Sequence, residues 1–349
     1  MTYDLRLFDK KILIIRFSAL GDVAMTIPVV YSLAKNNPDT EFVFLSKPAL
    51  RKLFFNAPTN FRFEEIDFKN RHKGLFGLWS LFLELRKQNF DQIADLHSVL
   101  RSYILTFFFR LTGTKIAAID KQRNAKRQLI AAKSDEKQQL PTSFERYEKV
   151  FRQLGFEVNT QFTSIFEAKG DLTKLGAVVS EKKEKWIGVA PFAKHIGKIY
   201  PIDNMERVIE LLSKEGVKIY LFGGGNEEKA ILGKWESSYP NVISTVGRID
   251  MEKELILMSH LDGMVTMDSG NMHLASLVAC PVVSVWGATH TLAGFYGWNQ
   301  DPKDAVQNEN LDCRPCSIYG NKACHRGDYA CLNEISPEML ANRIKSRFL

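Results

Sequence analysis

Two kinds of hydrophobic segment alternate along the chain. Short, nearly continuous apolar runs such as 11–17 (KILIIRF) and 40–46 (TEFVFLS) are typical of strands that are buried on both faces. The segment 23–38 instead has apolar residues at helical spacing and ends at Asn-Asn-Pro. Strands are also predicted at 90–98 and 115–120, with another helical segment between them. The alternation predicts a parallel sheet covered by helices on both faces.

The same pattern restarts after the polar segment 131–143 and a helical segment at 144–156. Further strands are predicted at 185–192, 217–225, 241–247, 261–267 and 281–287, with helices between them. The sequence therefore predicts an α/β fold with two doubly wound, Rossmann-like domains, 1–165 and 182–335. A C-terminal helix at 336–349 is expected to pack back on the first domain. Ligands of such sheets bind beyond the carboxyl ends of the strands, so the loops there are the candidate sites.

Charge is distributed unevenly along the chain. Residues 1–170 hold 27 Lys and Arg against 18 Asp and Glu, although the whole chain has a formal net charge of only +7. A basic first half suits nucleic acid, anionic lipid or a phosphorylated substrate, and charge alone does not separate these. No signal peptide is recognisable at the N-terminus, and the apolar run 103–111 is too short to span a bilayer. We therefore expect a cytoplasmic protein.

The loop 16–22 (RFSALGD) directly follows the first predicted strand. In one interpretation Gly21 makes the turn and Asp22 caps the next helix. In the other, Asp22 is a general base that accepts a proton from a bound hydroxyl. The dinucleotide fingerprint G-x-G-x-x-G is absent from this loop, which argues against a nicotinamide-dependent enzyme.

Three loops of the second half carry polar residues that suit an anionic ligand. Lys198 is either part of a solvated charge run or a point charge for a phosphate. Glu227 follows three glycines and either binds ribose hydroxyls or favours a helix start electrostatically. The stretch 268–270 (DSG) precedes a predicted helix, whose free amides and dipole favour a pyrophosphate. His273, one turn inside that helix, is more typical of a packed histidine than of a catalyst.

Four of the five cysteines lie near the end of the chain, at Cys313, Cys316, Cys324 and Cys331. Their spacing, C-x2-C-x7-C-x6-C, begins like a zinc site but continues unlike a standard finger. In a cytoplasmic protein such cysteines are thiols or metal ligands rather than a disulfide framework. A structural zinc, reduced packing thiols and a bridge formed on oxidation all stay open.

Taken in order, these loops resemble those of glycosyltransferase family 9, the ADP-heptose:lipopolysaccharide heptosyltransferases. The family motifs R-x-S-x-x-G-D, D-L-H, K-x-W-P, G-G-x-x-E and D-S/T-G-x-M-H-L-A have counterparts at 16–22, 95–97, 198–201, 223–227 and 268–275. Phe192 and Tyr200 replace the family's glycine and tryptophan beside Lys198, which alters the expected donor pocket. The resemblance implies a GT-B architecture, in which two Rossmann-like domains face a central cleft, with the acceptor on the first and the nucleotide sugar on the second.

The resemblance also implies roles for individual residues. Asp22 would deprotonate the acceptor hydroxyl, while Lys198 and the helix start at Ser269 and Gly270 would stabilise the leaving diphosphate. Glu227 would bind the ribose and Asp268 the donor sugar. The other expected donor contacts are Ala193, Lys194 and His273, and the expected acceptor contacts are Arg16, Ser18, Gly21, His97 and Arg101. Basic residues expected to meet a phosphorylated acceptor are Arg62, Lys69, Arg71, Lys73, Arg123, Lys126 and Arg127.

The sequence therefore predicts an inverting glycosyltransferase that moves a heptose or a related sugar from a nucleotide-diphosphate donor, expected to be ADP-heptose, to a lipopolysaccharide inner-core acceptor. Catalysis is expected to need no cofactor, and the structural zinc is the one candidate metal. The expected partners are the nucleotide sugar and a phosphorylated lipid-linked saccharide, with peripheral contact at the inner face of the cytoplasmic membrane and no nucleic acid.

Two alternatives stay open at this point. The first is a Rossmann-type oxidoreductase, which the missing glycine fingerprint opposes. The second is a zinc-bearing nucleic-acid-binding protein, which the pI of about 9.0 and the four cysteines suggest. Against it, the basic residues are spread through an α/β domain and no recognised nucleic-acid motif accompanies them.

Overall fold

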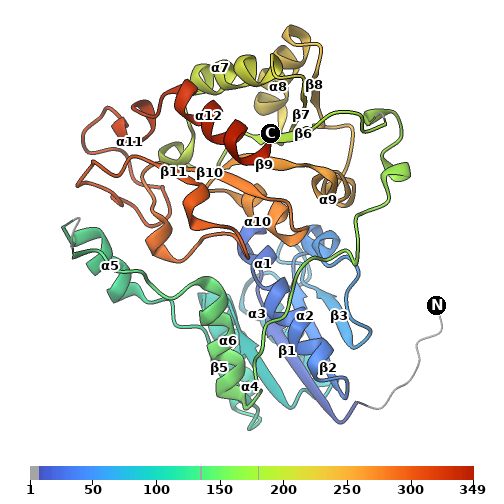
Figure 1. Ribbon diagram of the computed structural model, residues 1–349. Coiled ribbons are helices and arrows are strands. Elements are labelled where there is room, and N and C mark those ends of the chain that lie inside the picture. Colours follow the sequence, from blue (N-terminus) through green and yellow to red (C-terminus); the bar gives the residue numbers. More distant parts are fainter. Residues whose placement is uncertain (1–7, 134–135, 180) are drawn as a thin grey trace. The chain divides into compact units, whose positions relative to one another are not determined.

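The computed structural model describes residues 8–133, 136–179 and 181–349 (Figure 1). Contacts within the chain group it into two compact units. Unit 1 comprises Met1–Lys121 and Ser143–Phe162, and unit 2 comprises Gln122–Thr142 and Thr163–Leu349. Each unit is built on one parallel sheet, which confirms the predicted α/β fold with two Rossmann-like sheets.

The sheet of unit 1 has the strand order β3-β2-β1-β4-β5. Its strands are β1 (Lys10–Ile15), β2 (Thr40–Ser46), β3 (Phe61–Glu65), β4 (Gln92–Asp95) and β5 (Lys115–Ala118). The central strand β1 pairs with both β2 and β4, so that Ile15 lies opposite Leu45 on one side and Asp95 on the other. The carboxyl ends of β1 and β4 are therefore neighbours, which brings the loops after them together.

Helices cover both faces of this sheet. They are α1 (Leu20–Ala24), α2 (Ile27–Asn36), α3 (Gly74–Arg86), α4 (Leu100–Arg110) and α6 (Ser143–Leu154). The helices α3 and α4 bury one side against apolar side chains of β1, β2 and β4, while α2 and α6 pack on each other and α6 on β4 and β5. The single helix predicted at 23–38 is split, because α2 restarts at Ile27 with Pro28 in its first turn.

The sheet of unit 2 has the strand order β11-β10-β9-β6-β7-β8. Its strands are β6 (Trp186–Ala190), β7 (Lys218–Leu221), β8 (Val242–Ser244), β9 (Gly263–Met267), β10 (Val282–Trp286) and β11 (Ala305–Gln307). The strand β9 lies between β6 and β10, with Thr266 opposite Ala190 and Met267 opposite Val285. The loops after β6, β9 and β10 therefore leave the same edge of the sheet side by side.

The helices of unit 2 are α5 (Arg123–Ala131), α7 (Ile202–Ser213), α8 (Asn226–Ser238), α9 (Met251–His260), α10 (Gly270–Leu277), α11 (Ala330–Asn333) and α12 (Pro337–Phe348). None of the helices in the described parts of the chain combines the length and the apolar character needed to cross a bilayer.

The C-terminal helix departs from its prediction, because α12 packs beside α7 within unit 2 (Figure 1). Leu340, Ile344 and Phe348 of α12 belong to the apolar core of that unit. A side chain on Gly263 of β9 would overlap the Phe348 ring, so the glycine permits this close approach. Full burial of each such side chain stabilises the unit by about 1.5–3 kcal/mol. The expected packing of 336–349 on the first domain is thus corrected.

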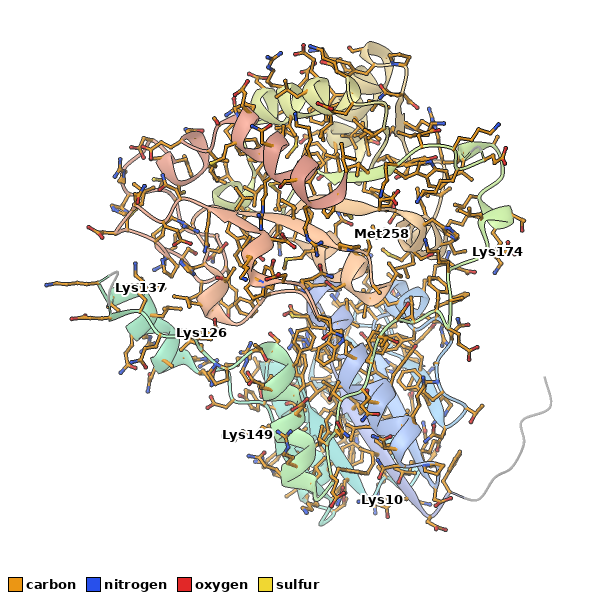
Figure 2. All side chains as sticks on the ribbon, in the orientation of Figure 1. Lys10, Lys126, Lys137, Lys149, Lys174 and Met258 are labelled. Carbon is orange, nitrogen blue, oxygen red and sulfur yellow. The ribbon has the colours of Figure 1, made fainter. Side chains whose placement is uncertain are left out.

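The segment 122–142 also departs from the predicted boundary at 165. Its helix α5 groups with unit 2, because Leu129 packs on Ala293 and Ile318. Lys126, labelled on this helix in Figure 2, lies over the rings of Phe295 and Tyr319. The basic residues Arg123, Lys126 and Arg127 therefore belong to unit 2, so the positive excess of residues 1–170 is not confined to unit 1.

Candidate active site

The loop after β1 holds an ion pair between Arg16 and Asp22. Nη2 of Arg16 lies 2.8 Å from Oδ1 of Asp22, and Nη1 of Arg16 donates to the carbonyl of Leu96 at 2.6 Å. The Arg16 side chain is largely buried, whereas the Asp22 side chain is 36% exposed. A buried guanidinium thus holds in place a carboxylate that a substrate can reach.

Asp22 also caps its own helix, since its Oδ2 accepts a hydrogen bond from the Ala19 N–H at 3.1 Å. The capping and the functional interpretations are compatible, because a carboxylate offers about four lone-pair sites and these two bonds occupy only part of them. The sequence suggested that Gly21 makes the turn before this helix. Gly21 instead lies inside α1, where its carbonyl accepts the Met25 N–H.

His97 lies beside this pair, on the loop after β4. Its Nδ1 accepts the Phe17 N–H at 3.3 Å, so Nε2 carries the proton of the neutral ring. Burial, followed by the positive charges of Arg16 and Lys121, lowers the pKa of His97 to about 3. The ring is therefore neutral at physiological pH and can donate one hydrogen bond through Nε2.

Asp95 fixes the loop that carries His97. The Asp95 carboxylate is buried, and its Oδ1 accepts the N–H groups of His97 and Ser98, each at 2.9 Å. Burial raises the pKa of this carboxyl group. Asp95 thus has a supporting role in the D-L-H motif, and His97 is the member with a donor to offer.

Tyr147 of α6 is a neighbour that sequence reasoning missed. Its buried hydroxyl group donates to the backbone carbonyl of Asp22 at 3.2 Å. Tyr147 is spaced like any core residue of an amphipathic helix, so no local signal distinguishes it.

The other predicted acceptor contacts lie near the same edge of the sheet. Ser18 is partly exposed in the loop after β1, and Arg101 is exposed in the first turn of α4 with its guanidinium over the Phe68 ring.

In unit 2, the loops after β6 and β9 meet in an ion pair. Nζ of Lys198 lies 2.9 Å from Oδ2 of Asp268, and both side chains are mostly buried, at 16% and 6% exposed. Lys198 ends a short 3-10 helix, Ile196–Lys198, and Gly320 packs on its alkyl chain so closely that a Cβ there would overlap it. The sequence assigned these two residues to different parts of a donor, and the structure shows them bound to each other.

Asp268 immediately precedes Ser269, the N-cap of α10. The Ser269 side chain makes no capping hydrogen bond to the first turn of this helix. The first amides of a helix have no acceptor within it and carry the positive end of its dipole, so they suit an anion. His273 is buried within α10, in agreement with a packing role for this residue.

The remaining predicted donor residues lie on loops that leave the same sheet. Ala193 is partly exposed and Lys194 is exposed in the loop after β6. Glu227 is exposed in the first turn of α8, whereas the adjacent Glu228 accepts the Gly224 N–H at 2.7 Å. The glycine-rich loop is thus held by Glu228, while the exposed Glu227 side chain lies at the surface. Of these two neighbouring glutamates, the sequence singled out only the first, Glu227, as a ligand.

Arg314 is a buried residue of unit 2 whose structural role the sequence did not indicate. Its buried guanidinium donates to the carbonyls of Trp286, the last residue of β10, and of Gly287 and Thr289 in the loop that follows. A further bond reaches the carbonyl of Asn308. Because Arg314 lies between two cysteines, the sequence pattern around it was interpreted as a metal motif. The pattern gave no sign that the arginine holds backbone carbonyls in place.

The four late cysteines are free thiols. Throughout the part of the chain that the structure describes, no three His, Cys, Asp or Glu side chains are grouped so that they could hold a metal ion. The thiols nevertheless influence one another: burial, and then the charges of Cys313 and Cys324, raise the pKa of Cys316. The predicted zinc site is not confirmed.

Comparison with known proteins decides the family. A family model described as glycosyltransferase family 9 (heptosyltransferase) matches residues 78–324, which is more than half of the chain. The chain belongs to glycosyltransferase family 9. It is therefore a glycosyl-transferring enzyme, as its sequence predicted, and the oxidoreductase and nucleic-acid-binding alternatives receive no support.

Individual members of family 9 resemble the chain over nearly its whole length. It is 26% identical to lipopolysaccharide heptosyltransferase 1 of Campylobacter coli, covering 97% of this chain and 99% of the relative. A family 9 glycosyl transferase structure from Veillonella parvula superimposes with a TM-score of 0.74 at 18% identity, covering 99% and 98%. The structure of the E. coli ADP-heptose lps heptosyltransferase II gives 0.71 at 16% identity, covering 97% and 98%. These structures support the fold, with two Rossmann-like units.

Proposed function

We propose that this family 9 enzyme transfers a heptose from ADP-heptose to the core of a lipopolysaccharide acceptor, with inversion at the anomeric carbon. The names of its relatives point to heptose, to lipopolysaccharide and, for the E. coli structure, to ADP-heptose. The observation that carries the proposal is the pairing of Lys198 with Asp268 next to the uncapped first turn of α10. A cation beside free helix amides suits a diphosphate, and a carboxylate beside them suits sugar hydroxyls.

In the proposed reaction, the acceptor hydroxyl oxygen forms a bond to the anomeric carbon while the bond from that carbon to the diphosphate oxygen breaks. The hydroxyl proton passes to Asp22. The electron pair of the broken bond stays on ADP, whose growing charge is stabilised by Lys198 and the amides of Ser269 and Gly270. The ion pair with Arg16 fixes the orientation of the Asp22 carboxylate toward the acceptor hydroxyl. None of these steps requires a metal.

The remaining proposed contacts to donor and acceptor come from residues on loops and helix starts at the carboxyl edge of each sheet. Glu227 is proposed to bind the ribose of the nucleotide, with Ala193 and Lys194 beside the donor and His273 supporting α10 from within. Ser18, His97 and Arg101 are proposed to bind the acceptor, His97 as a neutral donor through Nε2. Because the acceptor is proposed to be lipid-linked, we also propose that the enzyme works in the cytoplasm, in peripheral contact with the inner face of the cytoplasmic membrane.

Calorimetry against a panel of nucleotide sugars tests the donor. We expect ADP-heptose to bind more tightly than ADP-glucose, UDP-glucose or GDP-mannose, because the diphosphate contacts are shared while the base and sugar contacts are not. Lys253→Ala, which replaces a partly exposed lysine on α9, provides the control and is expected to bind as the wild type does. Tighter binding of a UDP- or GDP-sugar would overturn the proposed donor while leaving the family untouched.

We further propose a structural zinc bound by Cys313, Cys316, Cys324 and Cys331, whose side chains would have to move together to bind it, because the described residues hold no such group. Its support is the cysteine spacing and the burial of the group, since burial raises the pKa of Cys331 to about 11 against the opposing charge of Arg314. A divalent cation would stabilise the thiolates of Cys316 and Cys331, which burial disfavours. The segment also carries Gly320, which packs on Lys198, so loss of the metal would loosen the proposed donor site.

Elemental analysis of the purified enzyme tests this. We expect about one zinc per chain, by the stoichiometry of a four-cysteine site, and we expect Cys313→Ser/Cys316→Ser to lose it together with several degrees of melting temperature. The buried Cys280 lies outside this group, so Cys280→Ser should keep the metal. A wild-type protein that is stable, active and free of zinc would contradict the proposal.

A further inference from the structure

The outer sides of α3 and α4 form an unusual surface on unit 1. The described part of the chain exposes twelve large apolar side chains, and eight of them lie on or directly after these two helices. They are Leu75, Phe76, Trp79 and Leu83 of α3, and Leu100, Tyr103, Phe107 and Leu111 of α4 and its C-cap. We call these eight residues the α3–α4 surface. Exposure on this scale marks an interaction site rather than ordinary scatter.

Helical spacing places these residues on one side of each helix. Positions 76, 79 and 83 follow the i, i+3, i+7 pattern of a single helical face, and so do 100, 103 and 107. The opposite faces are the buried ones, where Leu78, Phe82, Leu105 and Phe109 enter the core of unit 1. Each helix therefore has two apolar sides, and the core covers only one of them.

The two helices lie side by side, so their exposed faces are continuous. The ring of Trp79 stacks edge-on against Phe108 with centroids 5.0 Å apart, and Phe82 contacts both Phe108 and Phe109. Both helices follow strands of the same parallel sheet and so begin near its carboxyl edge. That is the edge that carries Asp22 and His97.

Extreme exposure is concentrated near the ends of the helices. Phe76 is 91% exposed in the first turn of α3, Leu100 is 74% exposed at the start of α4, and Leu111 is 70% exposed at its end. Removing such side chains from water is favourable wherever an apolar phase is available. Trp and Tyr, both present here, favour the interface between water and lipid.

The polar residues around this surface are basic. Lys73, Arg86, Lys87, Arg101 and Arg110 are all exposed on or next to the two helices. The only acidic residue within α3 and α4 is Glu84, and Arg71 and His72 pair with it. An apolar face with cationic neighbours and no unpaired carboxylate matches a bilayer that contains anionic lipid, because each lysine or arginine near such a surface adds attraction.

We propose that the α3–α4 surface docks on a bilayer that contains anionic lipid, with its aromatic side chains inserted among the headgroups. The inference deepens the proposed membrane contact and rests on the proposed function only for its choice of partner. Docking through this surface places the carboxyl edge of the unit 1 sheet next to the lipid, where a lipid-linked acceptor presents its sugar. This explains why eight of the twelve exposed large apolar side chains in the described part of the chain gather on these two helices.

Vesicle sedimentation of the full chain tests the surface. We expect the wild type to bind vesicles of phosphatidylglycerol and phosphatidylethanolamine, to bind phosphatidylcholine vesicles weakly, and to lose part of the affinity in high salt. Phe76→Ser/Phe107→Ser should bind the anionic vesicles about tenfold or more weakly. Met339→Ser, which removes an exposed apolar side chain from α12 of unit 2, should bind as the wild type does.

Fluorescence quenching gives an independent measure of insertion. Of the five tryptophans, Trp186, Trp235 and Trp286 are fully buried, Trp298 of unit 2 is partly exposed, and Trp79 of the α3–α4 surface is 45% exposed. Brominated phosphatidylglycerol in the vesicles should therefore quench the wild type, and Trp79→Phe should remove most of the quenched signal. Equal vesicle binding by the double variant and the wild type, no vesicle binding by either, or no quenching of Trp79 would each overturn the proposal.

Two further outcomes separate this proposal from its alternatives. If the wild type self-associates in solution, the double variant does not, and neither binds vesicles, the occupant is a second copy of the chain and lipid docking is wrong. Donor calorimetry of the double variant should match the wild type, because the substitutions lie in unit 1. Failure of vesicle binding with normal ADP-heptose binding would refute the surface alone, whereas vesicle binding without ADP-heptose binding would refute the proposed donor alone.

Discussion

Replacing Asp22 by asparagine is expected to lower the rate of sugar transfer by about a thousandfold, which is within the usual contribution of a general base. An amide has no basic oxygen to take the acceptor proton, yet its Oδ1 can still accept the Ala19 N–H that Asp22 accepts now. Donor binding should stay within a few fold of the wild type, because the proposed donor residues are in unit 2. Asp22→Ala should abolish transfer in the same way, with unchanged donor affinity measured by calorimetry.

Asp39→Asn is the matched control for this substitution. Asp39 is an exposed carboxylate just before β2, at the opposite edge of the same sheet from Asp22. The Asp39→Asn enzyme should transfer the sugar at the wild-type rate. Loss of the carboxylate at position 22 also leaves the Arg16 guanidinium without its ion pair, so circular dichroism should confirm that unit 1 remains folded. Unchanged turnover in Asp22→Asn would remove Asp22 from the base role.

Replacing Lys198 by methionine is expected to affect both activity and stability. Removing the cation proposed to meet the diphosphate should weaken donor binding about tenfold and lower kcat by about a hundredfold or more. The same change leaves Asp268 as a nearly buried carboxylate without the ammonium 2.9 Å away. Breaking such a pair destabilises a protein, here by about 2 kcal/mol since Lys198 is partly exposed. Steady-state kinetics and thermal melting measure the two effects.

A double variant separates these effects. In Lys198→Met/Asp268→Asn no buried charge is left unpaired, so the melting temperature should recover most of its loss while transfer stays low. Lys214→Met, an exposed lysine that follows α7, is the control for loss of one positive charge. A Lys198→Met enzyme with a wild-type kcat and KM would show that the Lys198–Asp268 pair is structural only.

Much of the fold follows from local patterns in the sequence. The run 40–46 matches β2 residue for residue, because a strand buried on both faces leaves an uninterrupted apolar signal. The candidate loops could be found for the same reason, since a loop that directly follows such a strand must lie at the carboxyl edge of the sheet. Arg16 and His97 were expected in one site, and the pairing of β1 with β4 brings their loops together.

Long-range packing could not be foreseen in the same way. The sequence gives no sign that Lys198 pairs with Asp268, which is seventy positions away, or that Tyr147 reaches the backbone of Asp22. Helix α5 was placed in the wrong domain because its neighbours in sequence belong to unit 1, whereas Leu129 finds its apolar partners in unit 2. Local composition decides which element forms, and only the three-dimensional fold decides what that element covers.

The most direct test of the central claim is the transfer reaction itself. Purified enzyme is incubated with ADP-heptose and a lipopolysaccharide acceptor that lacks its core heptose, and the acceptor is examined by mass spectrometry and its new linkage by NMR. The account predicts that the acceptor gains one heptose, with the anomeric configuration inverted from that of the donor, and that Asp22→Asn does not produce it. An acceptor left unmodified by ADP-heptose but modified by another nucleotide sugar, or a product with retained configuration, would contradict the account.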